Sequence, residues 1–276
     1  MSEARQRSLR VAVAQSDVRL GDIRGNLARA AAQLRAAGDA GAEFVLLPEL
    51  WSTGYDLEHA PALSHENRTS VLPELARLAQ QHRMVVAGSL LLSDELGRVR
   101  NTLTVHGPDG SLISEYAKIH LFGLMDEPHY LSPGDASVTF ALPQCTVGSA
   151  ICYDLRFPEL FRVYALEGAS LVILPAEWPA VRVEHWRTLV RARAIENQVF
   201  IIACNRAGTS GTTEFAGHSM VVDPLGQPIV EGGDTEDLLL ATLDFSRVDH
   251  ARAQMDLLGD RRSDVYGTPA QLANRQ

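Results

Sequence analysis

The feature that most constrains the fold is a regular alternation of short apolar runs with amphipathic segments. Residues 11–15, 44–47 and 85–91 have the length and aliphatic content of buried strands, whereas residues 26–37, ending at Gly38, and 72–82 have helical periodicity. Strand, helix, strand, helix is the order of a fold in which helices cover a sheet, because the apolar face of the sheet must be buried. The alternation therefore predicts an α/β protein.

The rest of the chain keeps this organisation. Residues 101–106 and 112–116 flank a Gly-Pro-Asp-Gly turn and predict a hairpin. Strands are then expected at 147–151, 171–174, 199–203, 219–222 and 238–243, and helices at 159–167 and 183–197. There is no internal repeat, low-complexity stretch or linker, so we expect residues 1–276 to form one domain.

Composition narrows the class of protein. A net charge of −9 and a pI near 5.5 argue against nucleic acid as a partner, because phosphate binding needs a basic surface. Three cysteines without close pairing suit a reducing cytosol, and no apolar run reaches the length of a membrane span. The nine histidines never fall at metal-ligand spacing. We expect a soluble cytoplasmic protein with no metal, no cofactor and no membrane association.

One cysteine stands where a strand-like run meets a helix-like run. In GSAICYDLRFPEL, residues 148–160, Cys152 ends the apolar run. Backbone N–H groups at such a turn, and the positive end of a helix dipole, favour a thiolate and an oxyanion beside it. Cysteine is also a common small core residue. The position alone therefore leaves two interpretations open, a core thiol and a nucleophile.

Charged residues follow other strand-like runs in the same way. Glu49 comes after the run VLLP, Lys118 ends ISEYAK, and Glu127 lies in the next loop. Taken singly, these residues fit a helix cap or surface ion pair, a lysine that reaches solvent, and a loop charge. Catalytic groups of α/β proteins gather beyond the carboxyl ends of strands, and a partly desolvated carboxylate is a suitable general base. The combination with Cys152 favours a covalent catalytic site.

The motifs LLPEL around Glu49, YAKIHLF around Lys118 and GSAICYDLRFPEL around Cys152 resemble the three signatures of the carbon–nitrogen hydrolase, or nitrilase, superfamily. The resemblance extends from about residue 10 to residue 267. It implies a four-layer αββα sandwich, a catalytic triad of Glu49, Lys118 and Cys152, and a supporting glutamate, Glu127, that holds the lysine and the base in place. It also implies a homodimer or a larger homo-oligomer.

The chemistry of these groups fits the hydrolysis of an amide. A thiolate that attacks the carbonyl carbon replaces one hard step by two easier ones. Glu49 would take the thiol proton, and Lys118 would supply the positive charge that a weak carboxylate base requires. Lys118 and the backbone N–H of Tyr153 would bind the oxyanion. We expect Asp154 to be structural and to cap the turn and helix that begin around Phe157.

The residues that follow Cys152 bear on the substrate. The run from Tyr153 to Pro158 is similar to the ω-amidase branch, and differs from the Trp-Glu pair of nitrilases and the Asn-Asp-Arg-Arg run of one group of carbamoylases. Residues 178–224 are similar to bacterial ω-amidase-like proteins associated with methionine salvage. The resemblance implies hydrolysis of the terminal amide of a small carboxylated amide such as 2-oxoglutaramate. The alternatives are an N-carbamoyl amino acid amidohydrolase, an aliphatic amidase and a nitrilase.

A substrate carboxylate needs a partner, and a guanidinium is the natural one. Arg156 is the nearest candidate; the alternative is that it braces the turn by pairing with Glu159 or another acid. Trp178, Tyr130 and Met125 are expected as walls of the substrate pocket, with ordinary packing as the alternative for each.

Overall fold

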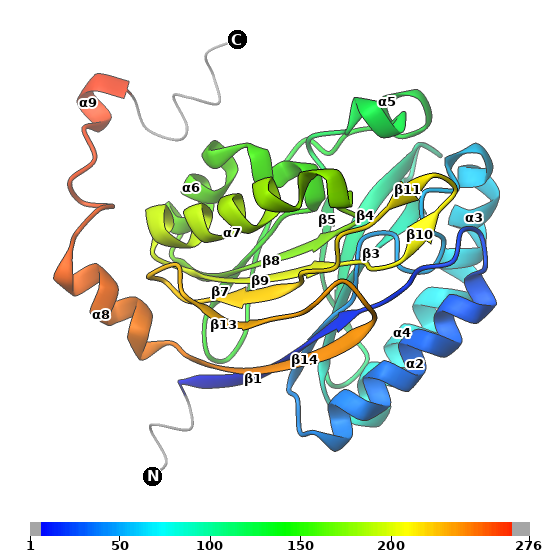
Figure 1. Cartoon of the computed structure of the whole chain (residues 1–276), viewed down its shortest axis with the longest axis horizontal. Helices are drawn as coiled ribbons and strands as arrows, with labels where there is room; N and C mark the ends of the chain where they lie inside the picture. Colours follow the sequence, from blue (N-terminus) through cyan, green and yellow to red (C-terminus); the bar gives the residue numbers. More distant parts are fainter. Residues whose placement is uncertain (1–6, 267–276) are drawn as a thin grey trace.

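Two mixed β-sheets form the centre of the structure, a computed structural model that describes residues 7–266 (Figure 1). Each sheet has six strands. The first has the order β14 (Asp237–Asp244), β1 (Ser8–Gln15), β2 (Phe44–Leu46), β3 (Val85–Ser93), β4 (Val99–His106), β5 (Leu112–Ala117). The second has the order β13 (Pro228–Glu231), β12 (Met220–Val222), β9 (Phe200–Asn205), β8 (Ala169–Ala176), β7 (Thr146–Ser149), β6 (Thr139–Ala141).

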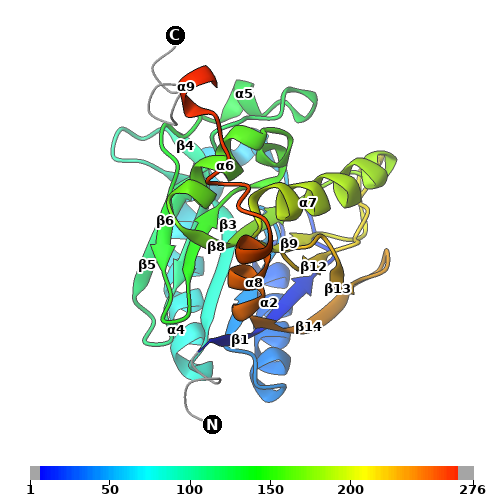
Figure 2. The ribbon, with the colours of Figure 1, turned by 90° about the vertical axis from the view of Figure 1, so that its left-hand side faces the viewer.

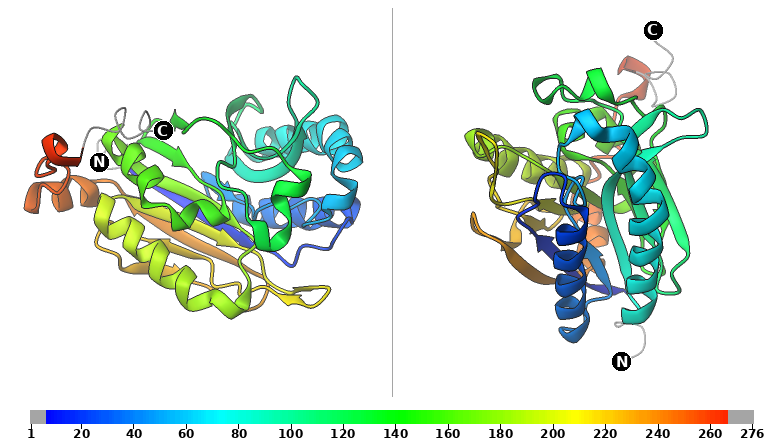
Figure 3. Two further views of the ribbon diagram at one scale, coloured as in Figure 1. Left: turned by 90° about the horizontal axis from the view of Figure 1, so that it is seen from above. Right: turned by 90° about the vertical axis from the view of Figure 1, so that its right-hand side faces the viewer.

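Helices cover both outer faces of this pair of sheets. Helices α2 (Ile23–Asp39), α3 (Ala60–Glu66) and α4 (Leu72–His82) lie on the side of the first sheet, and α6 (Pro158–Leu166) and α7 (Val183–Asn197) on the side of the second (Figures 1 and 2). Figure 3 shows α2 and α4 side by side. The predicted αββα sandwich is confirmed. No helix in the described range is long and apolar enough to cross a bilayer.

The two-residue period of β1 explains how one strand serves two cores. Val11 and Val13 face the core between the sheets, whereas Ala12 and Ala14 belong to the core beneath the helices. Successive side chains of a strand point to opposite faces, so an uninterrupted apolar run is what a strand covered on both faces requires. The small alanines leave room for Leu34 of α2, which is fully buried in the same outer core.

Several elements differ from the predicted ones. Helix α2 begins at Ile23, where the side chain of Asp22 accepts a hydrogen bond from the N–H of Gly25, and it passes through Gly38 instead of stopping there. The strand predicted at 147–151 ends at Ser149. Helix α8 (Ser246–Gln254) was not predicted, because only Val248 and Ala251 of this helix are buried and the apolar periodicity is too weak to detect.

Candidate active site

Lys118 lies at the centre of a buried cluster between the two sheets. It directly follows β5, and its Nζ donates to Oε1 of Glu49 and to Oε1 of Glu127, both at 2.7 Å. All three side chains are 0 % exposed. Glu49 comes shortly after β2 and Glu127 opens the short helix α5 (Glu127–Tyr130). The structure thus brings together three of the charged residues that the sequence singled out.

Neutral donors complete the bonding of the two carboxylates. The hydroxyl of Tyr55 lies 2.9 Å from Oε1 of Glu49 and of Glu127, and Nδ2 of Asn101 donates to Glu49 at 2.8 Å. Backbone N–H groups of Glu177 and Phe122 donate to the second oxygens of Glu49 and Glu127, at 2.8 and 2.6 Å. Because every oxygen has a partner, both carboxylates are held in fixed positions.

The charge of Lys118 is set by its two carboxylate partners. Burial acts against the ammonium, but the neighbouring Glu127 and Glu49 outweigh it and raise the pKa of Lys118 above its ordinary value. Lys118 is therefore a fixed positive charge at neutral pH, as the proposed oxyanion partner must be.

Cys152 sits on a strained turn at the end of the second sheet. Its φ of 45° lies in the left-handed region, which a non-glycine residue adopts only where the surroundings enforce it. Cys152 begins a 3₁₀ turn, Cys152–Arg156, while α6 starts only at Pro158. The expectation that a helix dipole acts directly on the thiol is therefore wrong, because the helix that would supply it begins six residues later.

The pKa of the thiol is raised, whereas the positive charge of Lys118 was expected to lower it. Burial, followed by the negative charge of Glu49, raises the pKa of Cys152 well above its ordinary value, and Lys118 only partly opposes this. The free enzyme thus holds a neutral thiol beside a carboxylate. A thiolate forms only if its proton moves at the same time, and Glu49 is the acceptor in contact with it.

Asp154 is structural, as expected, but its carboxylate forms its hydrogen bonds before Cys152 and on either side of Lys118, not at the helix near Phe157. Its carboxylate accepts from the N–H of Ile151 and the hydroxyl of Tyr116, and from the N–H of His120, where it also contacts ring atom Nδ1. It therefore fixes the turn at Cys152 and joins that turn to the loop after Lys118, and makes no cap at α6.

A narrow cavity leads to the thiol. Its volume is about 10 Å³, room for little more than one water-sized group, and Cys152 and Glu177 form part of its wall. The cavity shares Phe122, Pro179 and Arg182 with an outer cavity of about 380 Å³. The thiol is therefore reached from the side of the outer cavity, and Arg182 lies where the two cavities meet. The remaining residues of the inner cavity are Tyr153, Arg156 and Trp178.

Arg156 has no carboxylate partner among the described residues. Its guanidinium lies over the ring of Trp178, 4.7 Å from the centroid, and one Nη is 3.4 Å from Nδ1 of His185. Glu159, the partner that the alternative interpretation required, is exposed and makes no ion pair with it. Two residues of the inner cavity, Arg156 and Arg182, thus offer positive charge that no side chain of residues 7–266 neutralises.

The other predicted pocket residues lie at different depths. Trp178 and Tyr153 line the inner cavity, and Met125 lines the outer one. Tyr130 is 37 % exposed and stacks edge-on against His129, and it lines neither of these two cavities. Sequence reasoning missed Tyr55, Asn101, Glu177, Arg182 and Arg206. Glu177 and Arg206 follow β8 and β9, so the strand-end rule that singled out Glu49 would have found both.

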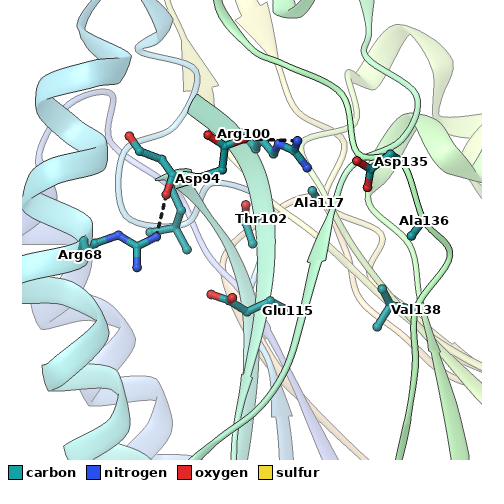
Figure 4. A pocket seen from close by; sticks show the side chains of 11 residues that line it. Arg68, Asp94, Arg100, Thr102, Glu115, Ala117, Asp135, Ala136 and Val138 are labelled. Atoms are coloured by element: carbon teal, nitrogen blue, oxygen red, sulfur yellow. Dashed lines mark hydrogen bonds and ion pairs between the residues drawn. The ribbon is translucent and has the colours of Figure 1, made fainter. Parts of the chain in front are cut away.

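A third cavity, lined in part by residues of β4 and of the edge strand β5, contains none of the residues of this cluster (Figure 4). It measures about 250 Å³; in its wall Arg68 donates to the carbonyl of Ser93, and Arg100 pairs with Asp94 at 3.2 Å. Its wall contains neither a thiol nor a lysine. Residues 7–266 contain no group of three or more metal-ligating side chains placed to hold an ion.

The αββα fold and the cluster together define a hydrolase that acts on carbon–nitrogen bonds. The chain belongs to the carbon–nitrogen hydrolase family, whose model matches residues 10–253. It is 41 % identical over 226 residues to the 2-oxoglutaramate amidase of Bacillus subtilis (strain 168), a match that covers 82 % of this chain and 87 % of that protein. It is 35 % identical over 254 residues to omega-amidase NIT2 of Mus musculus, which covers 87 % and 91 % of the two chains.

A solved structure supports the same placement. The amidase from Nesterenkonia sp. AN1, in a mutant form that carries the acetamide moiety of fluoroacetamide on its active-site cysteine, superimposes with a TM-score of 0.86 at 28 % identity. The match covers 95 % of this chain and 97 % of the amidase.

Proposed function

We propose that the protein is an ω-amidase, which hydrolyses the terminal amide of a small carboxylated amide of the 2-oxoglutaramate type. Glu49, Lys118 and Cys152 would be the catalytic residues, with Glu127 in support. The single observation that carries the substrate class is Arg156, a guanidinium on the wall of the Cys152 cavity without a carboxylate partner in the described chain. The names of the B. subtilis and mouse relatives point to the same class.

The first half of the reaction transfers the acyl group to the enzyme. As the amide carbonyl approaches, Cys152 gives its proton to Glu49 and its sulfur bonds to the carbonyl carbon. The oxyanion that forms is stabilised by Lys118 and the N–H of Tyr153. Glu49 then passes the proton to the amide nitrogen, the carbon–nitrogen bond breaks, and ammonia leaves a thioester on Cys152.

The second half repeats these roles with water. Glu49 takes a proton from a water molecule, the hydroxide attacks the thioester carbon, and the same two donors hold the oxyanion. The carbon–sulfur bond then breaks, the carboxylic acid is released and the proton returns to the thiol. Both carboxylate oxygens of Glu49 are fixed by hydrogen bonds. Glu49 can therefore act in both halves of the reaction without a rearrangement of its side chain.

The position of the substrate follows from the two cavities. Arg156 and Arg182 line the inner cavity together with Cys152, so a substrate whose amide reaches the thiol places its chain beside both guanidinium groups. Trp178 holds Arg156 by its ring and donates its indole N–H to the carbonyl of Arg182 at 2.8 Å. The ring thereby positions the guanidinium of Arg156 for the carboxylate end of the substrate, and the indole N–H fixes the backbone at Arg182.

We also propose a cytoplasmic homodimer or larger homo-oligomer. The three cysteines Cys145, Cys152 and Cys204 are free thiols, as a reducing compartment favours. The homo-oligomer follows from the family resemblance, and size-exclusion chromatography with light scattering tests it: a monomer across the concentration range would refute this part of the proposal.

A panel of substrates tests the proposed function. Ammonia release is measured for 2-oxo-dicarboxylic acid monoamides, neutral aliphatic amides, ureido acids and nitriles at one enzyme concentration. The proposal predicts the highest kcat/KM for the carboxylated amides. A preference for ureido acids, nitriles or neutral amides would refute the ω-amidase assignment and leave the family membership intact.

A further inference from the structure

The two sheets share one topology, and Glu177 follows the strand that corresponds to the strand before Glu49. From β14 to β5, and from β6 to β13, the strand pairs are antiparallel, parallel, parallel, antiparallel and antiparallel. Strands β2 and β8 hold the third position in their sheets. The chain around β2 reads VLLPELW and ends at Trp51, and the chain around β8 reads VILPAEW and ends at Trp178, with its glutamate one position later.

The local bonding is equivalent as well. The residue after Glu49, Leu50, donates its N–H to Oγ of Ser89 on β3 at 2.9 Å. The residue after Glu177, Trp178, donates its N–H to Oδ1 of Asn205 on β9 at 2.6 Å. In each sheet, a side chain of the next parallel strand fixes the turn that follows the glutamate. The backbone at Glu177 is therefore fixed directly after the end of β8.

Glu177 forms a fully buried ion pair. Its Oε2 accepts from Nη1 of Arg206 at 3.0 Å, and both side chains are 0 % exposed. Arg206 also reaches the carbonyl of Val18 and the carboxylate of Asp17, and it lies over the ring of Phe215, 4.1 Å from the centroid. Oε1 of Glu177 is buried without a hydrogen-bond partner in the described structure. A buried carboxylate with one unpaired oxygen lowers the stability of the fold, so the presence of Glu177 is not explained by stability.

Glu177 touches the reacting groups from two sides. Its backbone N–H donates to Oε2 of Glu49 at 2.8 Å, the oxygen that Lys118 leaves free. Its side chain lines the inner cavity together with Cys152. Among the described residues, Arg206 forms ion pairs with Glu177 and Asp17 alone. Arg206 therefore links the loop at Asp17 to Glu177, whose N–H holds the base Glu49.

We propose that Glu177, clamped by Arg206, is a positioning residue for Glu49: its main chain fixes the base, and its carboxylate charge strengthens Glu49 as the acceptor of the Cys152 proton. A negative charge beside a carboxylate favours the protonated form of that carboxylate, which is what proton transfer from the thiol requires. The proposal goes beyond the proposed function, because it holds for any amide that the enzyme hydrolyses.

The charge on Glu177 changes in the neutral pH range. Burial raises the pKa of Glu177 to about 7, with Arg206 opposing and Glu49 adding to the rise. Below that pH Glu177 is neutral, and above it the residue is ionised and assists the base. The charged and titratable groups around it come from every adjoining element and are Asp17, Glu49, Tyr55, Lys118, Glu127, Cys152, Arg156, Arg182 and Arg206.

The test is a pH profile of Cys152 alkylation by iodoacetamide, together with kcat/KM for an amide that the parent hydrolyses. In the parent, both rates should rise by about tenfold as Glu177 ionises through neutral pH. E177Q keeps an acceptor for Arg206 but stays neutral, so the rise should disappear. R206M removes the opposing charge, so the rise should move to higher pH. E231Q is the matched control: it changes a residue of β13 whose carboxylate pairs with Arg187 of α7, and it should leave both profiles unchanged.

The outcomes separate a positioning role from a structural one. A lower kcat in E177Q with an unmoved profile would overturn the proposal in favour of a structural role, and an unchanged rate and profile would overturn it outright. If R206M fails to fold in a thermal melt, E177Q decides alone. Because alkylation needs no substrate, the test remains decisive even if the enzyme hydrolyses none of the ω-amides.

Discussion

Replacing Glu127 by glutamine tests how the cluster holds Lys118. Both oxygens of Glu127 face donors: Oε1 accepts from Lys118 and the Tyr55 hydroxyl, and Oε2 accepts from the N–H of Phe122. A carboxylate satisfies all of them. An amide has one oxygen and one NH₂ group, so in either orientation the NH₂ group meets a donor, and one hydrogen bond of the cluster is lost.

The size of the effect follows from the bond that is lost. A hydrogen bond to a charged group contributes about 1.5–3 kcal/mol. If Lys118 must be in place when the oxyanion forms, the same free energy enters the activation barrier, and kcat should fall by about ten- to a hundredfold. The melting temperature should fall by about 3–12 °C, at about 2–4 °C for each kcal/mol in a chain of this size.

Steady-state ammonia release with the best amide of the panel measures this loss, and Glu159→Gln is the matched control. Glu159 is exposed in the first turn of α6 and has no described partner, so its variant should match the parent in rate and melting temperature. If Glu127→Gln keeps kcat within about twofold of the parent, Lys118 does not depend on Glu127, and the reasoning from the cluster is refuted.

Three further predictions address the nucleophile, the substrate and the turn. Cys152→Ala should abolish ammonia release and leave the melting temperature near that of the parent; residual activity within about tenfold would show that another group attacks. Arg156→Lys should lower kcat/KM far more for carboxylated than for neutral amides, and equal losses would indicate a bracing role. Asp154→Asn should lower the free energy of unfolding by about 2 kcal/mol in urea denaturation, because Asp154 accepts bonds from Ile151, His120 and Tyr116; an unchanged midpoint would contradict its structural role.

Most of the fold was predictable because it depends on periodicity. Strands that are covered on both faces need continuous apolar runs, and residues 11–15, 44–47 and 171–174 show them clearly. Weakly buried elements were not predictable. Helix α8 buries two side chains and the strands β10 (Thr209–Ser210) and β11 (Thr213–Glu214) bury none, so their sequences carry almost no apolar signal.

Site residues were predictable where a charged residue follows a strand. Properties of the site that depend on packing between distant parts of the chain were less predictable. Glu49, Lys118 and Cys152 were found from their positions, and the structure brings them together. The raised pKa of the Cys152 thiol could not be predicted from the sequence. It results from complete burial beside Glu49, a contact between residues more than a hundred positions apart. The sequence likewise shows no internal repeat beyond the short runs VLLPELW and VILPAEW, although the two sheets have equivalent topologies, because different side chains can build the same strand order.

The central claim is that Cys152 carries the acyl group of the amide during turnover. The most direct measurement is mass spectrometry of the enzyme after rapid mixing with substrate and acid quenching, followed by peptide mapping. If Cys152 is the nucleophile, the enzyme shows a transient mass increase equal to the amide minus ammonia, confined to the peptide that contains Cys152. An enzyme that turns over with unmodified Cys152 under single-turnover conditions, or an adduct on Cys145 or Cys204, would contradict it.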